Sequence, residues 1–254
     1  MKHDCRPVVK ESSGNKEHST KPCNLTAILL RAIAESEDGR YSQLGKMKKL
    51  IIFALLVIPV FVSANRQGEP TDFSKKLIQA AIERTKHIVR YDGSYRKIRY
   101  PNGDVPDNVG VCTDVVIRSY RKLGIDLQND IHEDMKENFG KYPKLWGLSK
   151  PDTNIDHRRV PNLRTLFKRK GIVLLATDKP NDYVAGDLVT WIVAGNLPHI
   201  GIVVNRRSRD GKRPLIVHNI GQGPQMEDML FEYPITGHYR YYGNSGLIEN
   251  ITQP

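Results

Sequence analysis

Apolar residues recur at helical spacing in the stretch that follows residue 70. From Thr71 to Val89 they lie three or four positions apart, and Thr71 can cap the first turn, so a helix is predicted that ends at Tyr91-Asp92-Gly93. A second helix is predicted from Cys112 to Leu123, with Gly124 ending it. Its mostly apolar stripe includes the cysteine. The opposite stripe, expected on the exposed side, holds Thr113, Asp114, Arg118, Arg121 and Lys122.

Shorter patterns surround the second helix. Residues 95–100 alternate and precede the turn-forming Pro101-Asn102-Gly103-Asp104, so a short strand is predicted there. Residues 130–139 and 160–170 favour two more helices, the latter with Pro161 in its first turn, and residues 143–151 favour a loop.

The last part of the chain has the composition of β-strands. Asp187–Val193, Ile200–Asn205 and Pro214–Asn219 are rich in β-branched residues, and Asp210-Gly211 supplies a hairpin turn between the last two. Helices followed by an antiparallel sheet predict an α+β fold, with N-terminal helices packed on a C-terminal antiparallel β-sheet. We find no repeat and no linker, so residues 65–243 are expected to form one domain and residues 244–254 a disordered tail.

Residues 47–64 have the three parts of a secretory signal. Met47-Lys48-Lys49 is basic, residues 50–62 are apolar, and small residues precede the cleavage expected after Ala64. The apolar run is shorter than the about 20 residues of a membrane span, so no integral membrane segment is expected after cleavage. The protein would then be periplasmic or secreted, and residues 1–46 would be a non-native upstream extension. The alternative is a genuine cytoplasmic extension with an uncleaved anchor.

The charge balance is basic. The whole chain has 39 Lys and Arg against 28 Asp and Glu. Without residues 1–64, which carry 10 and 6 of these, 29 remain against 22, a net charge of +7. For an exported protein this favours anionic cell-wall polymers, lipid headgroups or acidic peptides over nucleic acid, although ordinary surface charge explains it as well.

Cys112 is the candidate nucleophile. It is the only cysteine after residue 64, so it has no internal disulfide partner there. It begins the second predicted helix, and a helix N-terminus favours the thiolate form. The alternative is that the thiol only fills the core.

Two strand histidines are candidates for the base and its orienting group. His199 lies at the entrance of an apolar strand, where it can reach the cysteine helix. His218 ends the neighbouring strand, and side chains on one face of adjacent antiparallel strands lie about 5 Å apart. His218 can therefore orient His199, whereas Asn219 alternates to the other face. Either histidine can instead be an ordinary strand residue.

This pattern resembles the secreted cysteine peptidases of the NlpC type, which share a papain-like fold. The matching strings are Gly110–Thr113, Gly186–Trp191, Pro198–Val203 and Ile216–His218. The resemblance implies Cys112 as nucleophile, His199 as base, His218 as orienting group and Tyr100 as an auxiliary of the oxyanion hole. Two features depart from that superfamily: Val111-Cys112-Thr113 replaces its usual Asp-Cys-Ser, and the cysteine and histidine lie far apart in sequence.

From about Tyr91 to Tyr242 the chain is identified as a member of a narrower group, the bacterial domain-of-unknown-function family 1287. The strings that carry this resemblance are Gly110–Val116, Asn154–Leu163, His218–Gly221 and Gly237–Tyr239. The family name implies no activity, so the functional expectation depends on the wider resemblance.

Arg158 and Arg159 are candidates for binding a substrate carboxylate, because adjacent arginines on a loop can contact one bidentately. They can equally anchor that loop by pairing with Asp152, Asp156 or a backbone carbonyl. No metal site is expected, since residues 65–254 have no His-x-x-x-His or cysteine pair, and no cofactor is expected.

Together these features predict a monomeric, exported cysteine hydrolase, an amidase or endopeptidase that acts on peptidoglycan stem peptides or another peptide amide through a Cys-His-His arrangement. Two alternatives are a thiol acyltransferase and a non-catalytic cell-wall-binding module.

Overall fold

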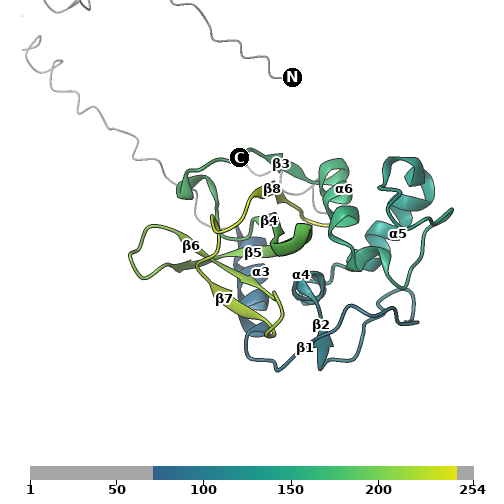
Figure 1. Ribbon diagram of the computed structural model, residues 1–254, viewed down its shortest axis with the longest axis horizontal. Coiled ribbons are helices and arrows are strands. Elements are labelled where there is room, and N and C mark those ends of the chain that lie inside the picture. The colour runs from purple at the N-terminus through teal and green to yellow at the C-terminus, as the bar shows by residue number, and fades with distance from the viewer. Residues whose placement is uncertain (1–70, 245–254) are drawn as a thin grey trace, which may run out of the picture. The chain divides into compact units, whose positions relative to one another are not determined.

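The computed structural model describes residues 71–244 (Figure 1). The expected upstream extension (1–46) and signal peptide (47–64) lie outside the described residues, as does most of the expected disordered tail. Asn244, the first residue of that tail, is described, and its side-chain amide donates a hydrogen bond to Asp130 Oδ1 (2.9 Å).

Within residues 71–244, four α-helices form in the predicted segments, although the first ends at Arg84 and not near Val89. Three of them start at a local signal: Thr71 Oγ1 accepts the N–H of Ser74 (3.1 Å), Asp126 accepts that of Gln128 (3.1 Å), and Pro161 lies in the first turn of the last helix. Their bounds are α3 Asp72–Arg84, α4 Cys112–Arg121, α5 Leu127–Asn138 and α6 Val160–Lys170. Short 3₁₀ turns are η1 Phe139–Lys141, η2 Asp156–Arg158, η3 Pro180–Asp182 and η4 Ala194–Asn196.

A six-stranded antiparallel sheet forms the second layer. The strand order is β3-β8-β4-β5-β6-β7, and the predicted turn at Asp210-Gly211 joins β5 to β6, with Gly211 at φ +73°. The strand bounds are β3 Ile172–Leu174, β4 Leu188–Val193, β5 Leu197–Arg207, β6 Pro214–His218, β7 Gln225–Glu227 and β8 Ile235–Arg240. The predicted α+β class is confirmed.

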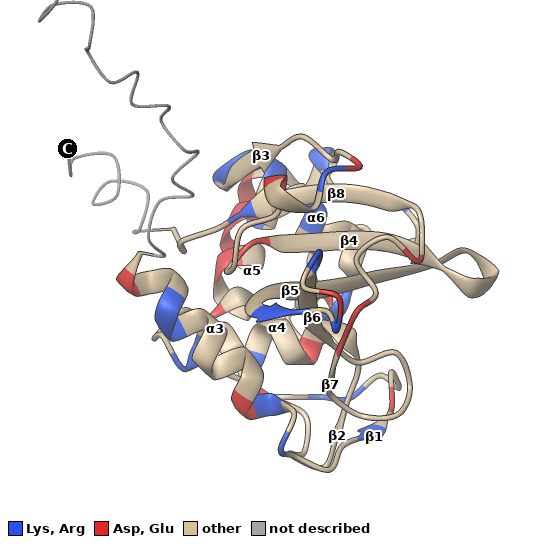
Figure 2. Ribbon diagram, turned by 90° about the vertical axis from the view of Figure 1, so that its left-hand side faces the viewer, with Lys and Arg blue, Asp and Glu red and all other residues tan. Residues whose placement is uncertain are grey.

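Each face of the sheet has its own apolar core. On one face α3, α4 and α6 pack against β5, and α3 and α4 lie side by side (Figure 2). That core contains Cys112, Ile200 and Val217. On the other face the segment after β7 covers Trp191, whose indole N–H donates to the Leu230 carbonyl (2.9 Å). The sheet is therefore buried on both sides of its central strands.

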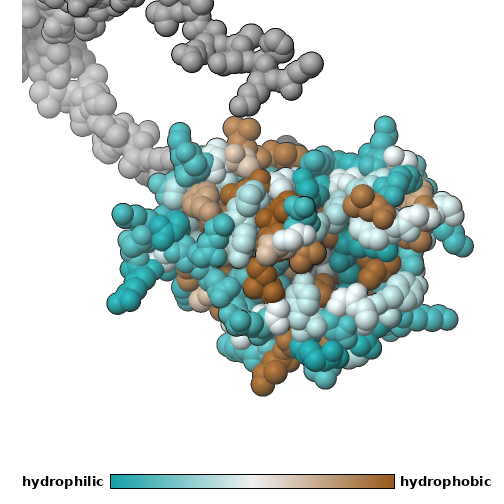
Figure 3. Space-filling model, viewed as in Figure 1, coloured by the Kyte–Doolittle hydropathy of each residue, from teal (hydrophilic) through white to brown (hydrophobic). Residues whose placement is uncertain are grey.

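The surface seen in Figure 3 is mostly hydrophilic, with apolar residues gathered toward its middle. Among the described residues, we find no helix with the length and hydropathy needed to cross a bilayer.

Two local predictions are wrong. Residues 95–100 form no strand; the pairing in this region is a short parallel pair of β1 Arg90–Tyr91 with β2 Val109–Gly110. The polar stripe of α4 is also not generally exposed: Thr113, Asp114 and Arg118 are buried. The reason is that residues 92–109 and the loop before α6 fold over this side of the helix and supply its polar groups with partners.

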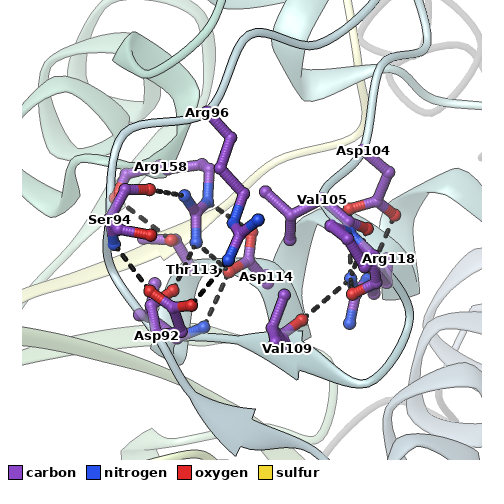
Figure 4. Close-up of polar contacts among 12 residues, drawn as sticks. Asp92, Ser94, Arg96, Asp104, Val105, Val109, Thr113, Asp114, Arg118 and Arg158 are labelled. Atoms are coloured by element: carbon purple, nitrogen blue, oxygen red, sulfur yellow. Dashed lines mark hydrogen bonds and ion pairs between the residues drawn. The ribbon is translucent and has the colours of Figure 1, made fainter.

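Buried ion pairs connect α4 to these covering segments (Figure 4). The Arg158 guanidinium donates two hydrogen bonds to the Asp114 carboxylate (both 2.9 Å), and only 2–3% of either side chain is exposed. Asp114 also accepts the backbone N–H of Val111 (2.7 Å), which caps the helix. Arg118 pairs in the same way with Asp104 and donates to the Val105 and Val109 carbonyls.

Replacing Arg158 with Met is expected to lower the free energy of unfolding by about 3–5 kcal/mol, because it leaves the Asp114 carboxylate buried and unpaired. The matched control is Arg213→Met. Arg213 pairs with Asp228 at a site where the two side chains are 33% and 34% exposed, and its loss is expected to cost about 1 kcal/mol or less. Urea denaturation measures both; equal stability of the two variants would contradict a buried ion pair that organises this region.

Candidate functional site

Cys112 is the first residue of α4 and packs in the core beneath the sheet. Its side chain is 4% exposed, and among the described residues it is the free cysteine. The thiol interacts with the backbone N–H groups of Ile200, Thr113 and its own residue. The sulfur therefore lies where the helix N-terminus meets strand β5.

Burial dominates the electrostatics of this thiol. It raises the pKa of Cys112 to about 12, and the nearby Asp114 carboxylate acts in the same direction. The three backbone amides lower the pKa but do not offset the loss of hydration. The expectation that the helix N-terminus yields a thiolate is thus not met in this state, and the group is a neutral thiol at pH 7.

Tyr91 is the tyrosine that lies beside Cys112. Burial raises the pKa of its phenol to about 12, and the neighbouring Cys112 and Asp114 contribute to the shift. Tyr91 is still 42% exposed, so it lies between the thiol and solvent. The pairing of Tyr91 with Gly110 in β1 and β2 brings it there.

The predicted auxiliary, Tyr100, lies elsewhere. Its hydroxyl donates to Asn129 Oδ1 (2.9 Å) and Glu133 Oε1 (2.8 Å) on α5, and its ring contacts His132. Tyr100 therefore belongs to the α5 contact and not to the surroundings of the thiol. Sequence proximity to Cys112 was a poor criterion, because residues 92–109 form a loop whose two ends, and not its middle, meet at the helix start.

The structure brings the two predicted histidines together. His199 Nε2 lies 3.0 Å from His218 Nδ1, and His218 Nε2 lies 2.8 Å from Glu227 Oε2. Both imidazoles are almost fully buried, whereas the Glu227 side chain is 43% exposed. Gly201 is on β5 and faces β6. A Cβ at this position would meet the side chain of Ile216 and the Cβ of His218, so the close approach of the two strands requires a glycine.

The hydrogen-bond chain assigns the tautomers. A carboxylate only accepts, so His218 must donate to Glu227 through Nε2–H, which leaves its Nδ1 as an acceptor. His199 must then donate through Nε2–H, which leaves a lone pair on its Nδ1. Burial, followed by the proximity of His218, lowers the pKa of His199 to about 3, and burial also lowers the pKa of His218. Both rings are therefore neutral at pH 7.

Cys112 and His199 approach the strand from different sides. Successive strand residues point to opposite faces: Ile200 packs with Cys112, whereas the His199 ring contacts Trp191 at 6.0 Å between centroids. No hydrogen bond joins the sulfur to the His199 ring in residues 71–244. The thiol meets the backbone amide of Ile200, the residue next to His199, so in this arrangement the thiol and the imidazole cannot exchange a proton.

The two candidate substrate-binding arginines are engaged in structural contacts. Besides Asp114, Arg158 donates to the backbone carbonyls of Ser94 and Asp92, and its burial keeps it from a solvent-borne carboxylate. Arg159 donates to Asp156 (3.1 Å) and stacks over Trp146 (4.0 Å to the ring centroid). These contacts support the alternative in which Arg158 and Arg159 anchor the loop before α6.

Sequence reasoning missed Glu227. Glu227 lies on a three-residue strand with no clear pattern, and only the pairing of β6 with β7 brings it to His218. Asn219 is 1% exposed, and its side-chain N–H₂ has no hydrogen-bond partner. Within residues 71–244 no group of three or more His, Cys, Asp or Glu is arranged to hold a metal ion.

Comparison with known proteins identifies relatives of this chain. Residues 78–241 match the family described as domain of unknown function (DUF1287). The chain is also 52% identical, over 152 residues, to the uncharacterized protein YijF of Escherichia coli (strain K12); the match covers 60% of this chain and 74% of that protein. Every candidate residue from Tyr91 to Glu227 lies within the matched family region.

The alkylation rate of Cys112 by iodoacetamide is expected to increase about tenfold per pH unit from pH 6 to pH 10 without a plateau, because burial raises the pKa of the thiol to about 12. Tyr91→Ala is expected to speed the reaction by opening the site, whereas Tyr95→Ala, at another exposed tyrosine, leaves it unchanged. Mass spectrometry follows the modification; a plateau with a midpoint below pH 8 would show instead that a thiolate is preformed.

Proposed function

We propose that this chain, which belongs to the family of the domain of unknown function DUF1287, is an exported cysteine hydrolase that cleaves an amide bond in peptidoglycan stem peptides. The observation that carries the proposal is the hydrogen-bond chain from Glu227 through His218 to His199. Such a chain leaves the lone pair of His199 Nδ1 available as a general base beside the strand residue that the thiol touches.

In the proposed reaction the thiol and imidazole start neutral. The transfer requires the His199 ring to reach the thiol from the face of β5 on which it packs with Trp191. As Cys112 Sγ attacks the carbonyl carbon, its proton then passes to His199 Nδ1, and the resulting imidazolium is stabilised by His218 and the Glu227 carboxylate. His199 then gives this proton to the leaving amine as the carbon–nitrogen bond breaks. Water, deprotonated by the same imidazole, hydrolyses the thioester and restores the thiol.

The groups around the sulfur suit a developing oxyanion. The backbone N–H groups of Cys112, Thr113 and Ile200 converge on this region, and the Tyr91 hydroxyl is a further donor at its exposed side. Such donors stabilise charge that appears only in the transition state. Tyr91 replaces Tyr100 in the proposed oxyanion role.

The resemblance to the NlpC-type peptidases supports the proposal through the order of the motifs. A cysteine at a helix start, a histidine on a following strand and a polar residue on the next strand occur here as Cys112, His199 and His218. A papain-like fold is proposed on this basis and on the packing of α4 against β5. The predicted signal peptide and the basic charge support export and an anionic wall polymer as the substrate.

Cys112→Ala is expected to abolish amide cleavage in purified sacculi, a loss of at least about 10³-fold, since no other described cysteine can replace it. Release of new amino groups measures hydrolysis, and a labelled acyl donor with an amine acceptor tests the acyltransferase alternative. Cleavage by the Ala variant at the parent rate would refute the proposal.

Glu227→Gln is expected to slow cleavage about tenfold. The amide keeps an acceptor but lacks the negative charge, and its N–H₂ group can reverse the tautomers of both histidines. The loss is smaller than for a buried triad carboxylate, because Glu227 is 43% exposed. Glu232→Gln, an exposed acid on the segment after β7, is the matched control, and equal rates of the two variants would exclude Glu227 from the relay.

The buried state of the thiol favours one competing function, a wall- or peptide-binding module without catalysis. A cysteine that is 4% exposed and hydrogen bonded to no histidine can serve as core filling. The two functions differ in one measurement: a binding module retains sacculus binding in the Cys112→Ala variant and releases no amino groups in either form.

A further inference from the structure

Arg84 is a buried arginine without a partner. It lies in the last turn of α3 and is 8% exposed. Its Nε is buried and has no hydrogen-bond partner, and its guanidinium makes no hydrogen bond or ion pair with any residue from 71 to 244. The nearby carboxylate of Asp104 is already held by Arg118 and Arg121. A buried cation without a partner raises the free energy of the folded state. An anionic ligand beside the guanidinium would lower it.

A cavity of about 540 Å³ opens beside this guanidinium. One wall is a face of α3, and the other is the end of α4, two elements that pack side by side (Figure 2). Its lining residues include three cations, Lys76, Arg84 and Lys122, and a single acid, Glu83. Glu83 is paired with Lys86 (2.7 Å) and Lys76 with Asp72 (2.7 Å), so the positive charge left to the cavity comes from Arg84 and Lys122.

We infer that this cavity binds a small anionic ligand through a phosphoryl or carboxylate group. Arg84 supplies the planar fork of donors that contacts two oxygens of such a group, and Lys122 adds a point charge at the rim. Ala80 and Leu123 line the same cavity and offer apolar contact to the remainder of the ligand. The volume is in the range of small-molecule sites.

This site is separate from the thiol. Cys112 begins α4, whereas Lys122 caps its C-terminus, and a helix of this length separates them by about 15 Å. Ligand binding here therefore does not depend on the proposed hydrolase activity. The Cys112→Ala variant is expected to bind the anion with unchanged affinity.

Calorimetric titration with inorganic phosphate, and separately with acetate, tests the site at constant ionic strength. Wild-type protein is expected to bind, and the tighter of the two probes identifies the group as phosphoryl or carboxylate. Arg84→Met is expected to weaken binding by at least about tenfold through the loss of a charge-assisted pair of hydrogen bonds. Lys122→Gln is expected to weaken it about two- to fivefold, as suits an exposed charge.

Arg206→Gln, at the exposed C-terminal end of β5, is the matched control and should bind as wild type. Lys122→Gln changes only an exposed side chain, so it tests the site even if Arg84→Met fails to fold. Wild-type protein that binds neither probe overturns the inference. So does equal affinity in Lys122→Gln, Arg206→Gln and wild type, because binding would then reflect general surface charge.

Discussion

The buried carboxylate of Asp114 is the constraint on which the geometry of the candidate site depends. It accepts the Val111 N–H and pairs bidentately with Arg158, so it fixes the start of α4. Arg158 in turn donates to the carbonyls of Asp92 and Ser94, which follow Tyr91. One ion pair thus positions the cysteine helix, the tyrosine beside the thiol and the loop before α6. A buried pair contributes little net stability, and its role here is to hold three segments in one arrangement.

Two opposing effects act on the thiol, and burial is the larger. The helix N-terminus and the Ile200 amide favour a thiolate, yet the pKa of Cys112 is raised to about 12 and that of His199 is lowered to about 3. Both shifts favour the neutral forms and disfavour a thiolate–imidazolium pair. The proposed chemistry therefore uses general-base transfer of the thiol proton at the moment of attack. The exposed Glu227 side chain and the exposed Tyr91 ring mark the two points where this buried arrangement reaches solvent.

Prediction from the sequence succeeded where a local signal and a strong period coincided. The bounds of α6 match the prediction from Val160 to Lys170, with Pro161 at its start, and the three apolar strands and the Asp210-Gly211 turn are also where they were expected. It failed where the strands are very short: β7 has three residues, and β1 and β2 have two residues each. The burial of Asp114 was also missed, because a charged stripe on a helix normally faces water.

The amino-acid sequence by itself determined the α+β class, the place of Cys112 at a helix start and the two strand histidines, because these follow from periodicity, capping and alternation within short segments. Only the tertiary structure decided which polar groups meet. It joined His218 to Glu227, brought Tyr91 and not Tyr100 to the thiol, and placed Arg158 under the helix instead of in a substrate pocket. It also set the protonation of the thiol, because the pKa of a buried group depends on hydration and on neighbours that come from distant parts of the chain.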